Sequence, residues 1–327
     1  MADVLSWRWI FWLNIPQSVI ILIVLMWLPN QREIEARVDY KGAIVLVGAL
    51  LFLSLALSQT DFFTFESPYP FLLAIVGIGL VILLVLVENK VCQPLLESFV
   101  FHSWAFLTSN LTQILVGVAL IIAMVTVALM ANTVMDKSPF IGSLWLLRLT
   151  GTIPLGAIAG GLLVSRFGSS PIAIIGLVLV AVGMFLASTW DVAVADSLLT
   201  GYLLVTGFGF GLVIVPITFT ALGAAGNDSQ GAAASLVVVS RMLGMMFGLA
   251  ALSAWGVQHF HMLTIGLEFP LPISGQGTEV FQSQTAEYLV KFRDAGIILF
   301  QRFFLVSSII SLVAVLSALA MKQGRQA

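Results

Sequence analysis

The chain of 327 residues is 60% hydrophobic and only 9% charged, and its formal net charge is −2. A soluble globular domain has about 25% charged residues, so this chain has too few to cover itself with a water-facing surface, and we expect it to lie in a lipid bilayer. No basic stripe suggests a nucleic-acid partner. The single cysteine, Cys92, excludes both an intramolecular disulfide and a thiolate metal cluster within the chain.

Apolar runs follow one another along the whole chain. A helix needs about 20 apolar residues to cross roughly 30 Å of hydrocarbon. The first run, Ile10 to Leu28, is long enough, and no small-residue cleavage site follows it, so we expect a true span and not a signal peptide. We predict nine spans, near residues 10–28, 42–59, 71–88, 105–130, 140–164, 171–189, 197–222, 232–257 and 297–320. The long connection over 258–296 contains a more helical stretch near "QSQTAEYLVKFRDAG".

The loop lysines and arginines predict the orientation, because cytoplasmic loops are enriched in them. If the loop after the first span is cytoplasmic, that side holds Arg32, Arg37, Lys41, Lys90, Arg166, Lys322 and Arg325. The other side holds Arg8, Lys137, Lys291 and Arg293, while Arg148, Arg241 and Arg302 fall inside predicted spans. Nine spans then place the two ends of the chain on opposite faces, with the N-terminus outside.

Motifs at the ends of these spans occur in a familiar order. They are "SWRWIFWLNIP" from Ser6, "VDYKG" from Val38, "ENKVCQPLLE" from Glu88, "DKSPFIGSLWLLR" from Asp136, "GGLLVSRFGSSP" from Gly160, and "GFGFGLVIVP" from Gly207 with a later R-x-x-G. Together they resemble the fourteen-helix drug:proton antiporters of the major facilitator superfamily. The chain departs from that pattern at Arg148, where a proline is usual, and at Ser165, where an acid is usual.

The resemblance covers the whole chain and implies an all-α polytopic membrane protein with a major facilitator fold. Residues 1–28 would be the last helix of an N-terminal bundle, 29–95 two central insert helices, and 96–327 a complete six-helix C-terminal bundle with a long external loop at 258–296. Five earlier helices of the N-terminal bundle would be missing. The chain would then be a truncated carrier, or one that depends on a second chain for those helices.

Polar side chains inside the spans are the candidates for a substrate path. Arg148 lies roughly 13 Å into its helix, where an arginine costs about 2.5–3.5 kcal/mol, so we expect it to face the bundle interior, with Thr152 on the same face. Asn110 and Gln113 form a polar stripe on the fourth span, and Thr218 follows Pro216. The competing interpretation is structural, with Arg148 bonded to neighbouring helices and the amides in interhelical hydrogen bonds of about 0.6 kcal/mol each.

Glycines, a proline and two arginines are the candidates for gating and helix packing. Gly207, Gly209 and Gly211 before Pro216 predict a closely packed, bendable helix, of the kind that often lines transporter sites. They lack the G-x-G-x-x-G spacing of a nucleotide loop. The resemblance implies a gating or helix-pairing role for Arg241 with Gly244, and a cytoplasmic latch at Arg166 and Gly168, for which plain positive-inside anchoring is the alternative. Arg302 is expected to extend to the membrane interface.

No pattern points to catalysis. His259 and His261 are spaced H-x-H, but a metal site would need Glu268 or Glu279 as a further ligand, so we expect no metal. There is no Ser/His/Asp or paired-carboxylate arrangement, so we expect neither an enzyme nor a cofactor.

The resulting hypothesis is a secondary active transporter, or a fragment of one, that exports drugs or other small hydrophobic molecules by proton exchange. Its partners would be the lipid bilayer, a small-molecule substrate, protons and possibly a second chain, in the inner (plasma) membrane of a bacterium. The alternative is a truncated or partner-dependent membrane protein with no transport activity of its own.

Overall fold

The computed structural model describes residues 8–27, 40–58, 67–88, 103–225, 229–271 and 278–321. The chain divides into two units, Met1–Asp39 and Tyr40–Ala327. Cys92 and most of the "ENKVCQPLLE" motif lie outside the described residues. The predicted division into 1–28, 29–95 and 96–327 stays a prediction.

The described residues form nine α-helices and one turn of π-helix. Each of the nine predicted spans overlaps one of these helices. Six of the helices, α6 to α11, are long and apolar enough to cross a membrane, whereas the others are shorter by the same measure, so the count of nine crossings stays a prediction. The helices are α1 (Trp9–Trp27), α2 (Tyr40–Ser58), α4 (Tyr69–Glu88), α6 (Trp104–Leu129), α7 (Pro139–Phe167), α8 (Ser169–Ala187), α9 (Asp196–Ala224), α10 (Gln230–Thr264) and α11 (Thr278–Leu319), and the π turn is Met130–Val134.

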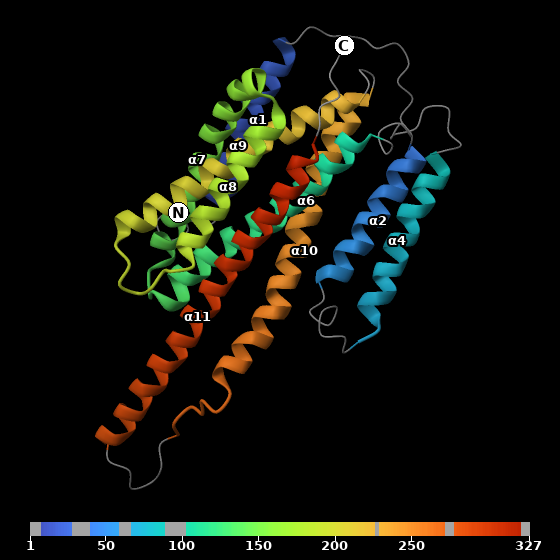
Figure 1. Ribbon diagram of the computed structural model, residues 1–327. Helices are drawn as coiled ribbons and strands as arrows, with labels where there is room; N and C mark the ends of the chain where they lie inside the picture. Colours follow the sequence, from blue (N-terminus) through green and yellow to red (C-terminus); the bar gives the residue numbers. More distant parts are fainter. Residues whose placement is uncertain are drawn as a thin grey trace. The chain divides into compact units, whose positions relative to one another are not determined.

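The six helices from α6 to α11 form one bundle (Figure 1). Helix α9 packs against α7, α8 and α6, and α6 packs against α10 and α11. Helix α11 also packs along α8. Helices α6 and α9 each contact three or more neighbours, and the buried residues that they contribute include Leu120, Val127, Leu203 and Phe210.

Two helix pairs of the bundle run parallel and in close contact. In the α7–α9 pair, Arg148 contacts Thr200 and Thr152 contacts Leu204. Along the same face, Gly160 lies against Leu212, so the residue numbers rise together in both helices. In the α6–α10 pair, Asn110 bonds Ser240 and Gly117 lies against Met245, again in parallel.

Helix α11 is tied to its neighbours by serines. Ser307 donates a hydrogen bond to the Ala119 carbonyl on α6, and Ser308 donates one to the Ala181 carbonyl on α8. Nearer the C-terminus, Ser317 donates to the Thr108 carbonyl and accepts from Thr112 at 2.9 Å. These hydroxyls are buried, and inside a membrane interhelical bonds of this kind hold helices that the hydrophobic effect does not drive together.

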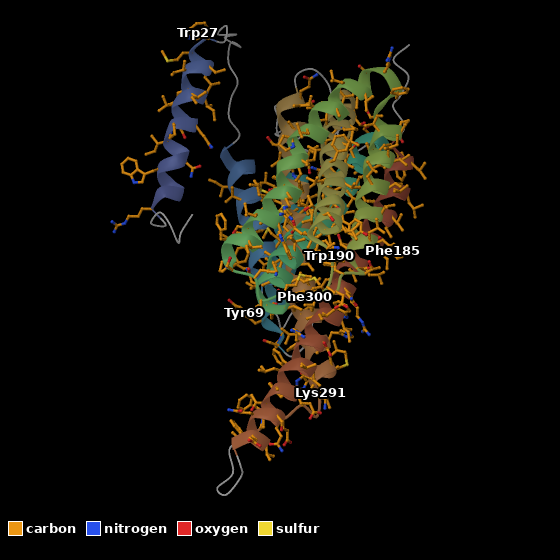
Figure 2. The ribbon with its side chains drawn as sticks, turned by 90° about the vertical axis from the view of Figure 1, so that its left-hand side faces the viewer. Trp27, Tyr69, Phe185, Trp190, Lys291 and Phe300 are labelled. Atoms are coloured by element: carbon orange, nitrogen blue, oxygen red, sulfur yellow. The ribbon has the colours of Figure 1, made fainter. Side chains whose placement is uncertain are left out.

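Helices α10 and α11 continue past the ends of their neighbours (Figure 1). The predicted connection over 258–296 contains the end of α10, which runs to Thr264, and the first part of α11, which begins at Thr278; its position outside the membrane stays a prediction. Charged residues such as Lys291, which bonds Glu287 one turn earlier, end the apolar run but do not end the helix. Figure 2 shows Lys291 on this projecting part of α11.

The remaining helices are simpler. Helix α2 packs along α4, where Gly77 admits the side chain of Leu53, and α2 also contacts α10. Helix α1 belongs to the other unit and contains Pro16; its described side chains are exposed, Trp27 at its end among them (Figure 2).

Candidate functional site

Arg148 lies at one end of the α7–α9 contact. Its Nη1 donates to Oδ1 of Asp196 and to Oγ1 of Thr200, both at 2.8 Å. Asp196 is the first residue of α9 and its side chain is 64% exposed, whereas that of Arg148 is 28% exposed. The arginine is therefore neutralised by a carboxylate at the helix end and joins two helices. Arg148 is thus bonded to a neighbouring helix, and its role in a substrate path stays a prediction.

The face that Arg148 shares with Thr152, Gly156 and Gly160 is a packing face. The Thr152 hydroxyl lies 3.3 Å from the Leu204 carbonyl of α9. A Cβ atom added at Gly156 would lie 3.0 Å from Cα of Gly211 and would collide with the Phe208 carbonyl. Thr152 therefore faces α9, and its role in a substrate path stays a prediction.

The glycines of α9 lie in its contacts with both α7 and α8. A Cβ atom at Gly211 would lie 2.7 Å from the backbone N of Ala157, and one at Gly207 would lie 2.8 Å from the Leu149 carbonyl carbon. Gly209 faces α8, where the nearest atom to an added Cβ is the Gly176 carbonyl oxygen at 2.8 Å. The three glycines thus place α9 against two helices at once, as expected for a closely packed helix.

Pro216 is buried within α9 and the helix continues through it. The Thr218 hydroxyl donates to the Ile214 carbonyl at 2.9 Å, and the Thr220 hydroxyl donates to the Pro216 carbonyl at 3.0 Å. Proline at this position removes the hydrogen bond to Leu212, four residues earlier. The two threonine hydroxyls thus bond other carbonyls of the same helix, and a role of Thr218 in a substrate path stays a prediction.

The polar stripe of α6 divides into two different environments. Asn110 donates to the Phe106 carbonyl and accepts a 2.8 Å bond from Ser240 of α10. Gln113 is fully buried, and neither its Oε1 nor its Nε2 has a partner among the described residues. Asn110 therefore bonds across helices, whereas Gln113 is held inside the bundle without a compensating bond.

Arg241 and Gly244 both meet α6 through their backbones. The Arg241 carbonyl carbon is 3.1 Å from a Cβ added at Gly117, and Gly244 lies against Ile114. These contacts agree with helix pairing. Arg166 and Gly168 lie at the connection between α7 and α8. Arg166 is exposed in the last turn of α7, and Gly168 has φ +82°, a conformation that favours glycine and allows the tight turn into α8.

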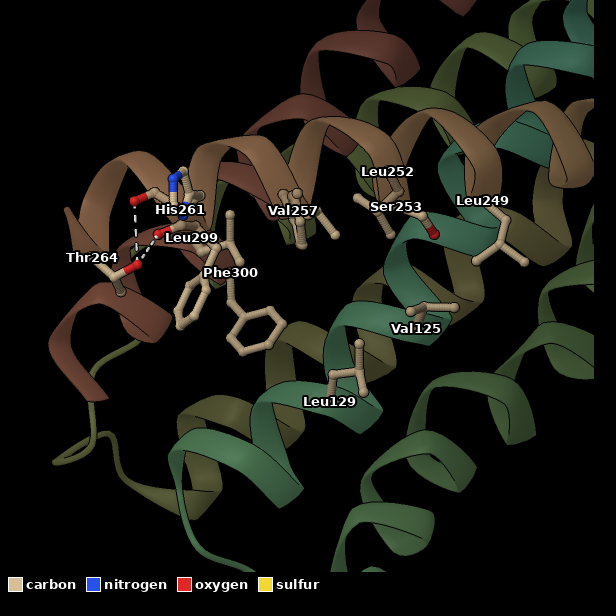
Figure 3. Close-up of a pocket in the computed structure, with 13 residues that line it drawn as sticks. Val125, Leu129, Leu249, Leu252, Ser253, Val257, His261, Thr264, Leu299 and Phe300 are labelled. Carbon is tan, nitrogen blue, oxygen red and sulfur yellow. Dashed lines mark hydrogen bonds between the residues drawn. The ribbon is translucent and has the colours of Figure 1, made fainter. Parts of the chain in front are cut away.

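The structure reveals a pocket that the sequence did not indicate. A cavity of about 570 Å³ lies between α6, α10 and α11, near the point where α10 and α11 leave the bundle (Figure 3). Its lining is apolar and aromatic, with Ser253, His261 and Thr264 as the polar residues. The lining residues come from three helices that are far apart in the sequence, so no local sequence motif indicates the pocket. Only the fold brings these residues together. The principal apolar residues are Val125, Leu129, Leu249, Val257, Phe260, Leu299, Phe300 and Phe303.

His259 and Arg302 lie together beside this pocket. The Arg302 guanidinium contacts Nε2 of His259, whose ring stacks on Trp255 with ring centroids 5.0 Å apart. Arg302 thus joins α11 to α10. A cation beside the imidazole opposes metal binding there, and no group of three or more metal-ligating side chains occurs among the described residues.

No family model matches the chain. Among curated proteins, it is 32% identical over 270 residues to the triacylglyceride transporter of Mycobacteroides abscessus, covering 78% of this chain and 52% of that protein. It is 30% identical over 329 residues to the triacylglyceride transporter of Mycobacterium tuberculosis, covering 93% of this chain and 61% of that protein. For the corresponding protein of Mycolicibacterium smegmatis the identity is 29%, with 96% and 59% covered.

The chain is similar to bacterial transporters. It spans between half and two thirds of the length of these relatives. They are named as transporters and not as enzymes, which agrees with the expectation that the chain is not an enzyme. The six long apolar helices and these relatives together describe a multi-pass membrane protein.

Proposed function

We propose that the chain is the C-terminal part of a secondary transporter of the major facilitator type, whose substrate is a neutral acylated lipid. The observation that carries the proposal is the similarity, over 93% of the chain, to a protein named as a triacylglyceride transporter. The geometry supports it, since the bundle is long enough to span a membrane and contains an apolar cavity within the size range of ligand pockets, about 300–1,000 Å³.

Proton-coupled export of drugs, the function implied by the family resemblance, is the second candidate. The apolar walls of the cavity would accept a hydrophobic drug as well as an acyl chain. The buried polar side chains of the described residues include no carboxylate. The relatives favour the lipid as substrate.

A reconstitution experiment tests the proposal. The purified chain is placed in vesicles that contain a fluorescent triacylglycerol, with a quencher or acceptor vesicle outside, and release is followed with and without an imposed pH gradient. A parallel set of vesicles contains a fluorescent cationic dye as the drug probe. We expect protein-dependent movement of the triacylglycerol and little movement of the dye.

Three other outcomes would change the conclusion. Movement of the dye alone would favour drug export. Equal rates of probe release with and without the pH gradient would contradict coupling of transport to protons. No movement of either probe by the folded chain, followed by activity when a chain with the N-terminal helices of a relative is added, would favour the partner-dependent alternative.

A further inference from the structure

The pocket between α6, α10 and α11 is elongated. Along α10 its lining runs from Leu249 to Thr264, which at a rise of 1.5 Å per residue is about 22 Å. Val125 and Leu129 of α6 lie toward the Leu249 end of this lining, and Leu299 and Phe300 of α11 lie toward the His261 end (Figure 3). The cavity therefore follows the helix axes, which suits an extended chain better than a compact molecule.

The length of α8 places the expected edge of the hydrocarbon layer near the pocket. Helix α8, with 19 residues from Ser169 to Ala187, is just long enough to cross that layer at about 1.5 Å per residue. Directly after α8, the Trp190 carbonyl accepts a 2.7 Å bond from Gln301 of α11. Leu299 and Phe303, which line the pocket, are two residues before and two residues after Gln301 in the same helix, so this part of the pocket lies at the level of the end of α8.

The two ends of the pocket differ in polarity. His261 and Thr264 lie at the end where α10 leaves the bundle, and the end near Leu249 and Val125 is apolar except for Ser253 (Figure 3). A lipid in a bilayer has the same polarity, with its ester groups at the interface and its chains directed inward. An exposed imidazole can donate a hydrogen bond to an ester carbonyl.

The wall between α10 and α11 is closed. Phe303 packs against Gly256, where an added Cβ would lie 2.7 Å from the ring. Trp255 contacts Phe303 with centroids 5.5 Å apart, and Arg302 contacts His259 on the far side of this seam. On the open side, Val257 is 68% exposed, so a chain can reach the pocket sideways from the membrane.

We propose that this side groove binds one ester-linked acyl chain of a membrane lipid, with the ester at the His261 end and the chain directed toward Leu249. The proposal rests on the proposed lipid substrate for the identity of the acyl chain. It goes further in placing the chain in a lateral groove of the C-terminal bundle, separate from the polar residues Asn110 and Gln113.

Photolabelling tests the groove directly. The chain is reconstituted in lipid nanodiscs with a triacylglycerol or a phosphatidylcholine that carries a diazirine, either near the ester or near the chain end, and adducts are mapped by mass spectrometry. We expect the ester-end probe to label near His261 and the chain-end probe near Leu249. Labelling by the triacylglycerol alone would identify the substrate as the source of the chain, and equal labelling by both would identify any ester-linked bilayer lipid. An alkane of equal length that carries a diazirine has no ester group, so it should label the two ends of the groove without a preferred orientation.

A pair of matched substitutions provides the control. Val257→Trp places an indole ring in the open side of the groove, where it should compete with the acyl chain. We expect labelling of Leu299 and Phe303 to fall about tenfold, as for the loss of about 1.4 kcal/mol of binding free energy. Val238→Trp makes the same change at another exposed position of α10 outside the groove and should leave the labelling unchanged. Equal thermal stability of both variants confirms that they fold.

Uniform labelling of the lipid-facing helices, or labelling that Val257→Trp does not reduce, would overturn the groove. The transport assay in vesicles separates this result from the proposed function. Ordered labelling without lipid movement would support the proposed groove and contradict the proposed transport function. Lipid movement with uniform labelling would support the transport function and contradict the groove.

Discussion

Arg148 on α7 and Asp196 at the start of α9 form an ion pair of 2.8 Å, supported by a second bond from Arg148 to Thr200. A charge that is costly inside a membrane is thus balanced by a carboxylate at the helix end, where water can reach it.

This pair should contribute measurable stability. Because both side chains are partly exposed, we expect a coupling of only about 0.5–1 kcal/mol. A double-mutant cycle with Arg148→Met and Asp196→Asn, followed by thermal or denaturant unfolding in detergent, measures it. The exposed pair of Glu287 and Lys291 provides the comparison and should give a smaller coupling, because water and salt screen it more strongly. A coupling of zero between Arg148 and Asp196 would show that the contact has no energetic role.

The close approach of α7 and α9 should depend on Gly207. An added methyl group would collide with Leu149 and Thr152, so we expect Gly207→Ala to lower the free energy of unfolding by about 1–3 kcal/mol. Gly201 lies in the same helix with no atom within 4 Å of an added Cβ. Gly201→Ala should therefore raise stability by up to about 1 kcal/mol, through helix propensity. Equal effects of the two substitutions would contradict the packing described for Gly207.

The bond between Thr112 and Ser317 should stabilise the contact between α6 and α11. Both side chains are buried and their hydroxyls are 2.9 Å apart. We expect a coupling of about 0.6 kcal/mol in a cycle of Thr112→Val and Ser317→Ala, the average for interhelical bonds in membranes. Ser283→Ala, at an exposed position of the same helix, controls for the general effect of removing a hydroxyl. A control effect as large as that of Ser317→Ala would argue against the bond.

Helix α8 should separate two sides of the membrane. Arg166 precedes it and Asp191 follows it, and both are exposed. In a variant without Cys92, we expect Arg166→Cys to react with a membrane-impermeant maleimide only from the cytoplasmic side and Asp191→Cys only from the other side. Labelling of both from one side of sealed vesicles would rule out α8 as a crossing helix, and a reversed result would invert the orientation predicted from the loop charges.

Hydropathy was sufficient to locate the helices of the bundle, because a run of apolar residues must form a helix to satisfy its backbone in a membrane. The predicted span 171–189 and the helix Ser169–Ala187 differ by two residues at each end. The start of α11 was not predictable in this way. Lys291 and Arg293 end the apolar run, but a helix continues through exposed charged residues without difficulty.

The partners of the polar residues depended on the fold. The sequence indicated that Arg148 should face the bundle interior, but Asp196 is 48 residues away and becomes its partner only when α7 and α9 lie parallel. The glycine spacing in α9 predicted close packing, yet it did not show that Gly207 faces α7 and Gly209 faces α8. The groove beside Val257 was not predictable, because an apolar residue that lines a cavity has the same sequence signal as one that faces lipid.

The glycine contacts have a mechanical consequence. Where Gly211 meets Ala157 and Gly244 meets Ile114, peptide groups of neighbouring helices touch with no side chain between them. A sliding motion at these seams would have to lift one backbone over another. Large movements of this bundle are therefore expected to occur by tilting of the bundle as a whole, because these contacts hold its helices in fixed positions relative to one another.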